Sequence, residues 1–427
     1  MNSDGSNPAK KFYFLDYFYI ILSVFSGQHE ENSLEAIKQR FMQLKDKMKL
    51  GESKYKKLTI DEGTSLALTK TQIDRITYTF KQVLGEAIDY GLINYNDDFL
   101  TLTQEGQALL SLRDSKGEEE FNAALLQKME TSYRAFYYLV NFLYAANPND
   151  GCLFFPHYSP RLLDMPKSSL KTTRDVRSYI FKLMKKIEQD VWEFSKQRIQ
   201  LCADKLHEEL YKSQLLLPDD NAPFNSSNYN SVIRRCKDYF EIYLLKNIYK
   251  YNFSWSAFEI WSYRAKQLGI VHVTEFYPSF SGKLIFPLSI RTSEKKGKDF
   301  KQICTYDDSV LYIHSPEVEP GNIEVFSKYL VDAYFKIKRT AKTYFINLLA
   351  IREIVCYNMK ISEKTFESFL NHMYRLNLQS KLQIKIALEV DKLPEETKAM
   401  YLTREPVMIA GKYRNIIAID ISKEHYK

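Results

Sequence analysis

Apolar residues recur every three or four positions over several long stretches of the chain, and this spacing predicts helices. In the first hundred residues it predicts two helices within 11–48, separated by a polar break, and a third helix over 71–90. Alternating residues within 91–103 then predict two strands around the turn sequence NYNDD. Thr103 is the expected N-cap of a helix that starts at residue 104.

The predicted order, three helices, a strand, a tight turn, a strand and a helix, is typical of a winged helix. The segment LTLTQEGQALL, residues 100–110, resembles the junction of wing strand and helix found across bacterial winged-helix proteins. The resemblance is to the winged-helix superfamily at the level of the fold. It implies a winged-helix-like domain over residues 10–112.

The middle of the chain is predicted to be mainly helical. Residues 118–213 carry helical periodicity, and their aromatic run at 133–144 is expected to lie in a core or between helices. Base stacking is the alternative role for that run. The polar segment 214–230, which ends in PDDNAPFNSSNYN, is predicted to be a linker. Residues 231–323 are expected to combine helices with a β-hairpin.

A second winged-helix-like domain is predicted over residues 324–427. The pattern indicates one or two helices within 324–358, a helix over 363–376 and a strand over 382–390. Residues 406–421 are predicted to form a hairpin that turns at 410–412. The expected fold is therefore α+β and predominantly helical, with two winged-helix-like units flanking a helical middle region.

Composition is ordinary for a globular protein, with 45% hydrophobic and 26% charged residues. Five scattered cysteines form no CxxC pair, so neither a disulfide framework nor a zinc site is expected, and a reducing cytoplasm is predicted. The apolar segment 12–25 contains Asp16 and is too short to span a bilayer. It is predicted to be a packed helix, and no membrane association is expected.

Sequence patterns for catalysis are missing. The chain has no GxxxxGK[ST], GxGxxG, HExxH or GxSxG pattern. The nearest carboxylate pair after a predicted strand is Glu317 and Glu319, which lie beside prolines with no lysine spaced as a nuclease needs. We therefore expect no catalytic residue, metal or cofactor, and interpret this pair as part of a solvated loop.

Basic residues in the C-terminal unit suggest contact with double-stranded DNA. The net charge of the whole chain is only +7, which permits such a partner without requiring one. A winged helix places one helix in the major groove and its hairpin on the phosphates, so both need polar or basic side chains. The candidate residues on the helix and hairpin are Lys364, Ser368, Asn371, Arg375, Lys412 and Arg414. The alternative is that these side chains are merely solvated.

The N-terminal unit offers weaker candidates for DNA contact, Gln72, Arg75 and Thr79. Acidic residues surround them, and the turn NYNDD would be repelled by phosphate. A structural or protein-contacting role is the preferred interpretation of this unit. Lys336, Lys338, Arg339 and Lys342 add positive charge to the helix that precedes the C-terminal candidates.

These features together predict a non-catalytic, DNA-engaging accessory subunit of a bacterial multi-protein system. The layout resembles accessory components of prokaryotic defence or restriction systems, which implies an ATPase or nuclease on another chain. It also resembles the order of domains in kleisin subunits, which implies a protein-binding scaffold of a chromosome- or plasmid-structuring complex. A diverged restriction-type nuclease with a site assembled from scattered residues is the second alternative.

Overall fold

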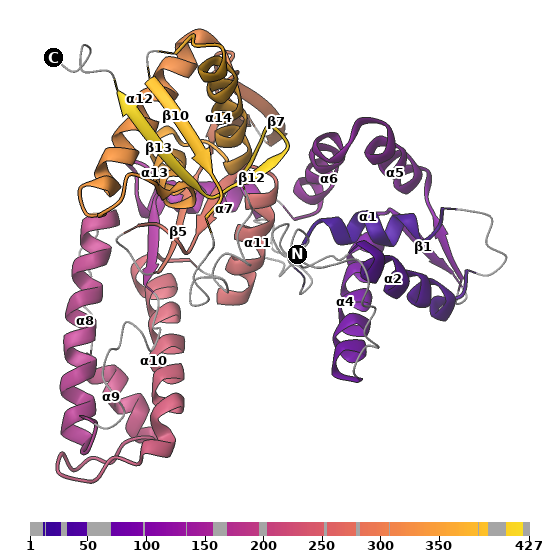
Figure 1. Ribbon diagram of the computed structural model, residues 1–427. Helices are drawn as coiled ribbons and strands as arrows, with labels where there is room; N and C mark the ends of the chain where they lie inside the picture. Colours follow the sequence, from indigo (N-terminus) through magenta and orange to yellow (C-terminus); the bar gives the residue numbers. More distant parts are fainter. Residues whose placement is uncertain are drawn as a thin grey trace. The chain divides into compact units, whose positions relative to one another are not determined.

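The chain is α+β and predominantly helical, with its strands in small sheets. The computed structural model describes the following residues: 12, 14–26, 32–48, 70–96, 99–133, 135–156, 169–195, 203–251, 254–278, 282–306, 308–382, 384–391 and 407–421 (Figure 1).

The chain packs into two compact units, each built from more than one segment. Unit 1 comprises Met1–Tyr138, Ile260–Val271 and Leu288–Lys427, and unit 2 comprises Leu139–Glu259 and His272–Pro287. The four consecutive domains expected from the sequence stay a prediction. The chain passes between the units four times, within α7, within α11, at the start of β4 and between β5 and β6.

The N-terminal part of unit 1 contains the helices and strands that the hydrophobic pattern predicts. They are α1 (Asp16–Ser23), α2 (Leu34–Met48), α4 (Lys70–Asp89), β1 (Ile93–Asn96), β2 (Phe99–Leu102) and α5 (Gln104–Lys116). Ser33, just before α2, forms an antiparallel bridge with Phe99 of β2. The predicted cap is also confirmed, because Thr103 Oγ1 accepts a hydrogen bond of 3.0 Å from the Gly106 N–H.

Helix α1 is a packed helix, as predicted. Phe18, Ile20 and Leu22 are completely buried. The charge of Asp16 within this apolar run is compensated by Arg113 of α5, whose Nη2 lies 3.1 Å from its carboxylate. The cation of Arg113 also lies over the ring of Tyr19, 4.8 Å from its centroid.

A further part of unit 1 consists of helices and a three-stranded sheet. Its elements are α6 (Glu118–Tyr133), the start of α7 (Ala135–Ala146), the end of α11 (Trp255–Gln267), β6 (Ser289–Thr292), β7 (Phe300–Tyr306) and β8 (Ser309–His314). Strand β8 is central in the order β6-β8-β7. Strand β7 was not predicted from the sequence. Phe136 and Tyr137 of the aromatic run are buried, as expected for a core role.

The C-terminal part of unit 1 contains a second small sheet and three helices. Its elements are α12 (Pro320–Lys338), β9 (Ile346–Asn347), α13 (Leu348–Met359), α14 (Glu363–Leu378), β10 (Ile384–Glu389), β11 (Val407–Ile409), β12 (Lys412–Arg414) and β13 (Ile416–Ile421). The sheet order is β10-β13-β9, and both pairings are antiparallel.

The predicted hairpin over 406–421 is correct only in its turn. Strand β11 pairs with β12 across that turn, whereas β13 pairs with β10 and β9. Strand β10 is an edge strand of this sheet. The side-chain amide of Asn377 in α14 bonds both main-chain groups of Ile386 in β10, at 2.9 Å to its carbonyl and 3.0 Å from its N–H.

Unit 2 is a helical stalk beside a three-stranded sheet. Besides the end of α7 and the start of α11, it contains β3 (Leu153–Pro156), α8 (Thr173–Ser195), α9 (Ala203–Lys212), a 3₁₀ turn (Ser226–Asn228), α10 (Tyr229–Tyr243), a π-helical turn (Leu244–Ile248), β4 (Val271–Thr274) and β5 (Gly282–Pro287). Helices α8 and α10 run side by side (Figure 1), and apolar side chains of both line one small pocket. Strand β3, in the order β3-β5-β4, was not predicted.

The segment predicted as a linker lies within unit 2 and packs against the start of α8. The first N–H groups of a helix have no partner within the helix. Here the Thr173 N–H donates to the carbonyl of Ala222 at 3.0 Å, and the Arg174 N–H donates to that of Asp220 at 2.9 Å. Asp220 also accepts a 2.6 Å hydrogen bond from Arg177. The polar residues that look like a linker therefore cap a helix.

Candidate nucleic-acid interface

Helix α14 carries four of the predicted DNA-binding residues. Its N-cap is Ser362, whose hydroxyl accepts a hydrogen bond of 3.0 Å from the Thr365 N–H. The apolar face is completely buried and consists of Phe366, Phe369, Leu370 and Met373. Helical spacing consequently turns the opposite face outward, and Lys364, Ser368 and Arg375 are exposed on it.

The hairpin β11–β12 carries the other two candidates. Ile409 pairs with Lys412 across a two-residue turn, Ala410–Gly411. Both turn residues have positive φ, 50° and 73°, as a type I′ turn requires. Lys412 is exposed at the end of the turn and Arg414 is half-buried. The hairpin thus presents a cation at its tip, as the sequence predicts.

Asn371 joins the hairpin to α14. Its Nδ2 donates to the carbonyl of Met408 at 3.0 Å, and its Oδ1 accepts from the Ala410 N–H at 2.8 Å. The neighbouring carboxylate of Glu367 accepts from the Met408 N–H at 3.2 Å. These bonds hold the hairpin beside the helix and occupy the amide of Asn371 with main-chain groups. The structure therefore gives Asn371 a positioning role, while its contact with DNA stays a prediction.

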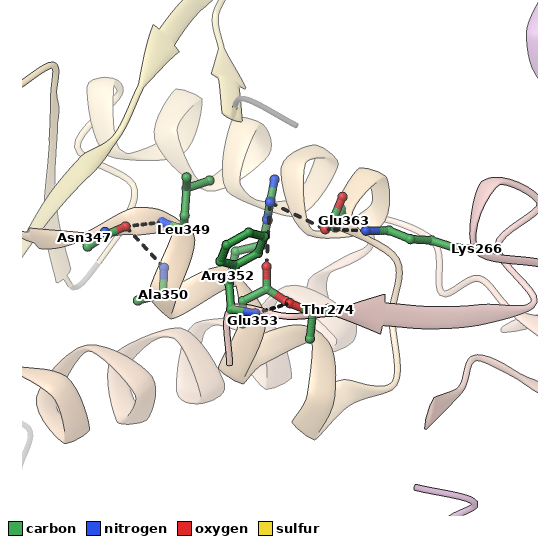
Figure 2. A network of polar contacts seen from close by, with 9 residues as sticks. Lys266, Thr274, Asn347, Leu349, Ala350, Arg352, Glu353 and Glu363 are labelled. Carbon is green, nitrogen blue, oxygen red and sulfur yellow. Dashed lines mark hydrogen bonds and ion pairs between the residues drawn. The ribbon is translucent and has the colours of Figure 1, made fainter. Parts of the chain in front are cut away.

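A group of buried and partly buried charged side chains lies on α13 and at the first turn of α14. Arg352 and Glu353 of α13 are almost completely buried, and Glu363 is the first residue of α14. The Nη2 of Arg352 lies 3.5 Å from the Glu363 carboxylate and 3.7 Å from that of Glu353. Lys266 reaches Glu363 from α11 at 3.3 Å. Figure 2 shows Arg352 extending from α13 toward Glu363.

This network fixes the first turn of α14 relative to α13. An unpaired charge in a buried position costs several kcal/mol, so the two helices are held where the charges meet. Asn347 fixes the start of α13 by accepting hydrogen bonds from the N–H groups of Leu349 and Ala350, at 2.9 and 3.3 Å (Figure 2). Sequence reasoning missed these residues. Their signal is the charged pair Arg-Glu inside the apolar run LLAIREIVC.

The structure says less about the weaker DNA-binding candidates in the N-terminal part of unit 1. The side chains of Gln72 and Arg75 lie outside the described residues, and Thr79 is half-buried on α4. The described surface of this unit is instead notable for exposed aromatic rings. The exposed fractions of Tyr78, Tyr95 and Phe99 are 47%, 45% and 58%. Asp97 and Asp98 of the acidic turn lie outside the described residues.

The arrangement is chemically suited to binding anions. Lys412, Arg375 and Lys364 are exposed cationic side chains that can donate hydrogen bonds to an anion. Glu319, considered above as half of a carboxylate pair, binds Lys298, with 2.7 Å between Lys298 Nζ and its Oε2. That carboxylate is therefore part of an ion pair at the start of α12.

Comparisons with known proteins add nothing to the geometry, because no family model, curated protein or solved structure matches the chain. Within the part of the chain that the structure describes, no helix combines the length and the apolar character needed to cross a bilayer.

Proposed function

We propose that the C-terminal part of unit 1 is a winged-helix module that binds double-stranded DNA. Its order of elements supports this proposal: α12, β9, α13, α14, β10 and β13, with β13 between the other two strands. In this interpretation α14 is the helix that enters the major groove. The β11–β12 hairpin belongs to the wing, because it is inserted between β10 and β13.

The observation that carries the proposal is the attachment of the hairpin to α14 through Asn371 and Glu367. A helix in the groove and a cation on the phosphates must act in one geometry, because phosphate contacts set the register in which base edges are read. The main-chain bonds of Asn371 fix that geometry before DNA binds. Lys412 then supplies a phosphate contact, and Arg375 on the exposed face of α14 supplies a donor for base edges.

We also propose that the N-terminal part of unit 1 is a winged helix, but with a different role. Its elements follow the same order, and Ser33 takes the place of β9 by bridging to β2. We propose that this second winged helix contacts other protein subunits, because exposed rings such as Tyr95 and Phe99 favour protein surfaces over phosphate. The whole chain would then be a non-catalytic accessory subunit of a bacterial defence or restriction system in the cytoplasm, alongside an ATPase or nuclease.

Fluorescence anisotropy with a labelled DNA duplex tests the proposal. The double variant Lys412→Ala/Arg414→Ala should weaken binding for every sequence and flatten the plot of log K against log salt by about two units. Arg375→Ala should change the preference between sequences instead. The matched control Arg234→Ala/Arg235→Ala removes the same charge from exposed positions of α10 in unit 2. Equal affinity of the hairpin variant and the wild type, with both folded, would exclude the duplex role.

A kleisin-like scaffold is the second candidate function, and the exposed aromatic rings of the N-terminal part favour it. In that case both winged helices bind partner proteins. The double variant Tyr95→Ala/Phe99→Ala should then lose co-purification with its partner subunits, while Lys412→Ala/Arg414→Ala leaves duplex affinity unchanged because the wild type has little. Strong duplex binding that depends on Lys412 would exclude a purely protein-binding scaffold.

A further inference from the structure

A second basic surface lies at the end of α12 and in the loop that follows it. The twenty residues 333–352 contain no aspartate or glutamate, although the chain as a whole has nearly balanced charge. Four of their cations, Lys336, Lys338, Arg339 and Lys342, are exposed or half-buried. Among the described residues, none of these four forms an ion pair with a carboxylate. Other surface cations do have such partners, as Lys298 has Glu319.

Two aromatic side chains stand beside these cations. Tyr344 has an exposed fraction of 73%, the highest of the large apolar and aromatic residues that the structure describes, and its neighbour Phe345 is 40% exposed. Leaving such rings in water is unfavourable, because their apolar surface stays hydrated. Exposed rings next to unpaired cations therefore indicate a surface that is covered when a partner binds.

The main chain that carries Tyr344 and Phe345 is held in place by hydrogen bonds, and the ring of Tyr344 contacts a lysine. The hydroxyl of the buried Tyr334 donates a 2.7 Å hydrogen bond to the carbonyl of Tyr344. On the side-chain level, Lys338 Nζ lies 4.3 Å from the centroid of the Tyr344 ring. Thr343 adds a 2.8 Å hydrogen bond from its hydroxyl to the carbonyl of Phe345. The main chain on which the exposed ring stands is thus fixed before binding, and Lys338 places a cation beside the ring.

Unpaired cations around an exposed aromatic ring match the chemistry of single-stranded nucleic acid. An unpaired base can stack on an aromatic ring, while its flanking phosphates bind lysine and arginine. Bases in a duplex are already stacked on both faces, so they cannot use the ring. We propose that residues 336–345 bind single-stranded DNA, with a base on Tyr344 and phosphates on Lys336, Arg339 and Lys342.

An anionic membrane would offer the same negative charge, but the structure favours DNA. Membrane-surface helices insert a broad apolar face. The apolar face of α12 is already buried within the protein through Phe326, Leu330 and Tyr334. Only the two neighbouring rings Tyr344 and Phe345 remain for insertion, whereas one exposed ring is sufficient to stack a base.

This inference is independent of duplex binding by α14 and the hairpin, because it uses none of the same residues. The two sites can therefore be separated by experiment. Fluorescence anisotropy with a labelled oligothymidylate of about 15 nucleotides measures single-strand affinity. The duplex assay described above, run on the same proteins, measures the other site.

Tyr344→Ala should lower oligothymidylate affinity by about 5- to 100-fold, because one stacked base is lost. Tyr344→Phe, which keeps the ring, should retain most of the affinity. The double variant Lys336→Gln/Lys342→Gln should flatten the salt dependence by about 1.4 units, or 0.7 for each lost phosphate contact on a single strand. All three variants change exposed side chains, so the folded state should survive, which circular dichroism checks. Arg234→Gln/Arg235→Gln, which removes two exposed cations of α10, is the matched control and should leave oligothymidylate affinity unchanged.

Several results would overturn the inference. The wild type could fail to bind the oligothymidylate, or Tyr344→Ala could bind it as tightly as the wild type. Loss of binding only in Lys412→Ala/Arg414→Ala would place single strands on the hairpin instead. Binding to phosphatidylserine vesicles that depends on Tyr344, without oligothymidylate binding, would assign the surface to a membrane. Failure of duplex binding alone would overturn the proposed function and leave this inference standing.

Discussion

Arg264 and Glu86 form a bidentate ion pair although they lie 178 positions apart in the sequence. Arg264 Nη1 is 2.6 Å from Glu86 Oε1, and its Nη2 is 2.8 Å from Oε2. Both side chains are fully buried. The Tyr90 hydroxyl also donates to Glu86 at 2.6 Å, and Arg264 lies 4.4 Å from the centroid of the Phe12 ring. Burial opposes the charge of Arg264, but Glu86 outweighs it, so the pKa of Arg264 is raised.

Removing one partner of this pair should be far more damaging than removing both. Glu86→Leu leaves the Arg264 cation buried without its counter-charge and should lower the free energy of unfolding by about 3–5 kcal/mol. Adding Arg264→Met to Glu86→Leu removes both charges and should cost much less than the sum of the single changes. Urea denaturation followed by tryptophan fluorescence measures all four proteins. Additive losses in this cycle would show that the pair contributes no coupling.

His207 should make unit 2 less stable in mild acid. Both ring nitrogens of this buried side chain on α9 lack a hydrogen-bond partner among the described residues. Burial lowers its pKa, and the nearby charge of Arg177 lowers it further, against the opposing effect of Asp204 and Asp220. The unfolded chain therefore binds the proton more readily than the folded chain. The stabilisation is complete above the ordinary pKa of about 6.5 and is lost as the pH falls below it.

His207→Leu removes this titration and should abolish the corresponding part of the acid destabilisation. The measurement is the free energy of unfolding of both proteins between pH 8 and pH 5. The difference between the two should change only below about pH 6.5, since every other titrating group is common to both. A difference that is constant over the whole range would contradict the assignment.

Two glycines in the first turns of helices should respond to alanine in opposite directions. A Cβ on Gly106 of α5 would lie 2.2 Å from the carbonyl oxygen of Leu92, closer than atoms can approach. Gly106→Ala should therefore destabilise the protein by about 1–3 kcal/mol. A Cβ on Gly321 of α12 meets no atom within 4 Å. Gly321→Ala should stabilise it by about 0.5–1 kcal/mol. Thermal unfolding of both variants gives the two signs, and equal signs would refute the steric explanation.

Asn371→Ala should loosen the hairpin without unfolding the module. The substitution removes the hydrogen bonds to Met408 and Ala410, so amide hydrogen exchange over 407–414 should accelerate. Duplex affinity should fall as well if the hairpin positions Lys412 for phosphate. For hydrogen exchange, Ser368→Ala is the matched control on the same helix, because among the described residues its exposed hydroxyl bonds only to the carbonyl of Lys364. Unchanged exchange in the hairpin would show that Asn371 does not hold it.

Local signals in the sequence were sufficient for the helices. Periodic apolar residues located α4 and α14 to within two residues, and Thr103 identified the start of α5. These features depend on neighbours within one or two turns. The pairing of strands does not depend on such near neighbours. In the sequence β13 looks like one arm of a local hairpin, but it pairs with β10. Strand β3 lies in a proline-rich stretch that carries no strand pattern. Pairing between distant segments is set by tertiary packing.

The exposed residues of the candidate site could be predicted from the sequence, but the residues that hold them in position could not. Lys412 and Arg375 were found because exposed basic residues follow from helical spacing and turn chemistry. The positioning role of Asn371 was not found, because an amide on a polar helix face suits DNA and main-chain groups equally. Arg352 and Glu363 were missed because their pairing depends on the angle between two helices. The DNA-binding roles themselves stay predictions.

The contact of Asn377 with Ile386 has a consequence for self-association. Edge strands expose main-chain groups that can recruit a strand of another molecule, and natural proteins block such edges. Here one side-chain amide occupies both the N–H and the carbonyl of Ile386 in the edge strand β10. An incoming strand would have to displace that amide and would lose two hydrogen bonds in the process. A single asparagine thus occupies part of the edge of this sheet, where charge or proline would serve in other proteins.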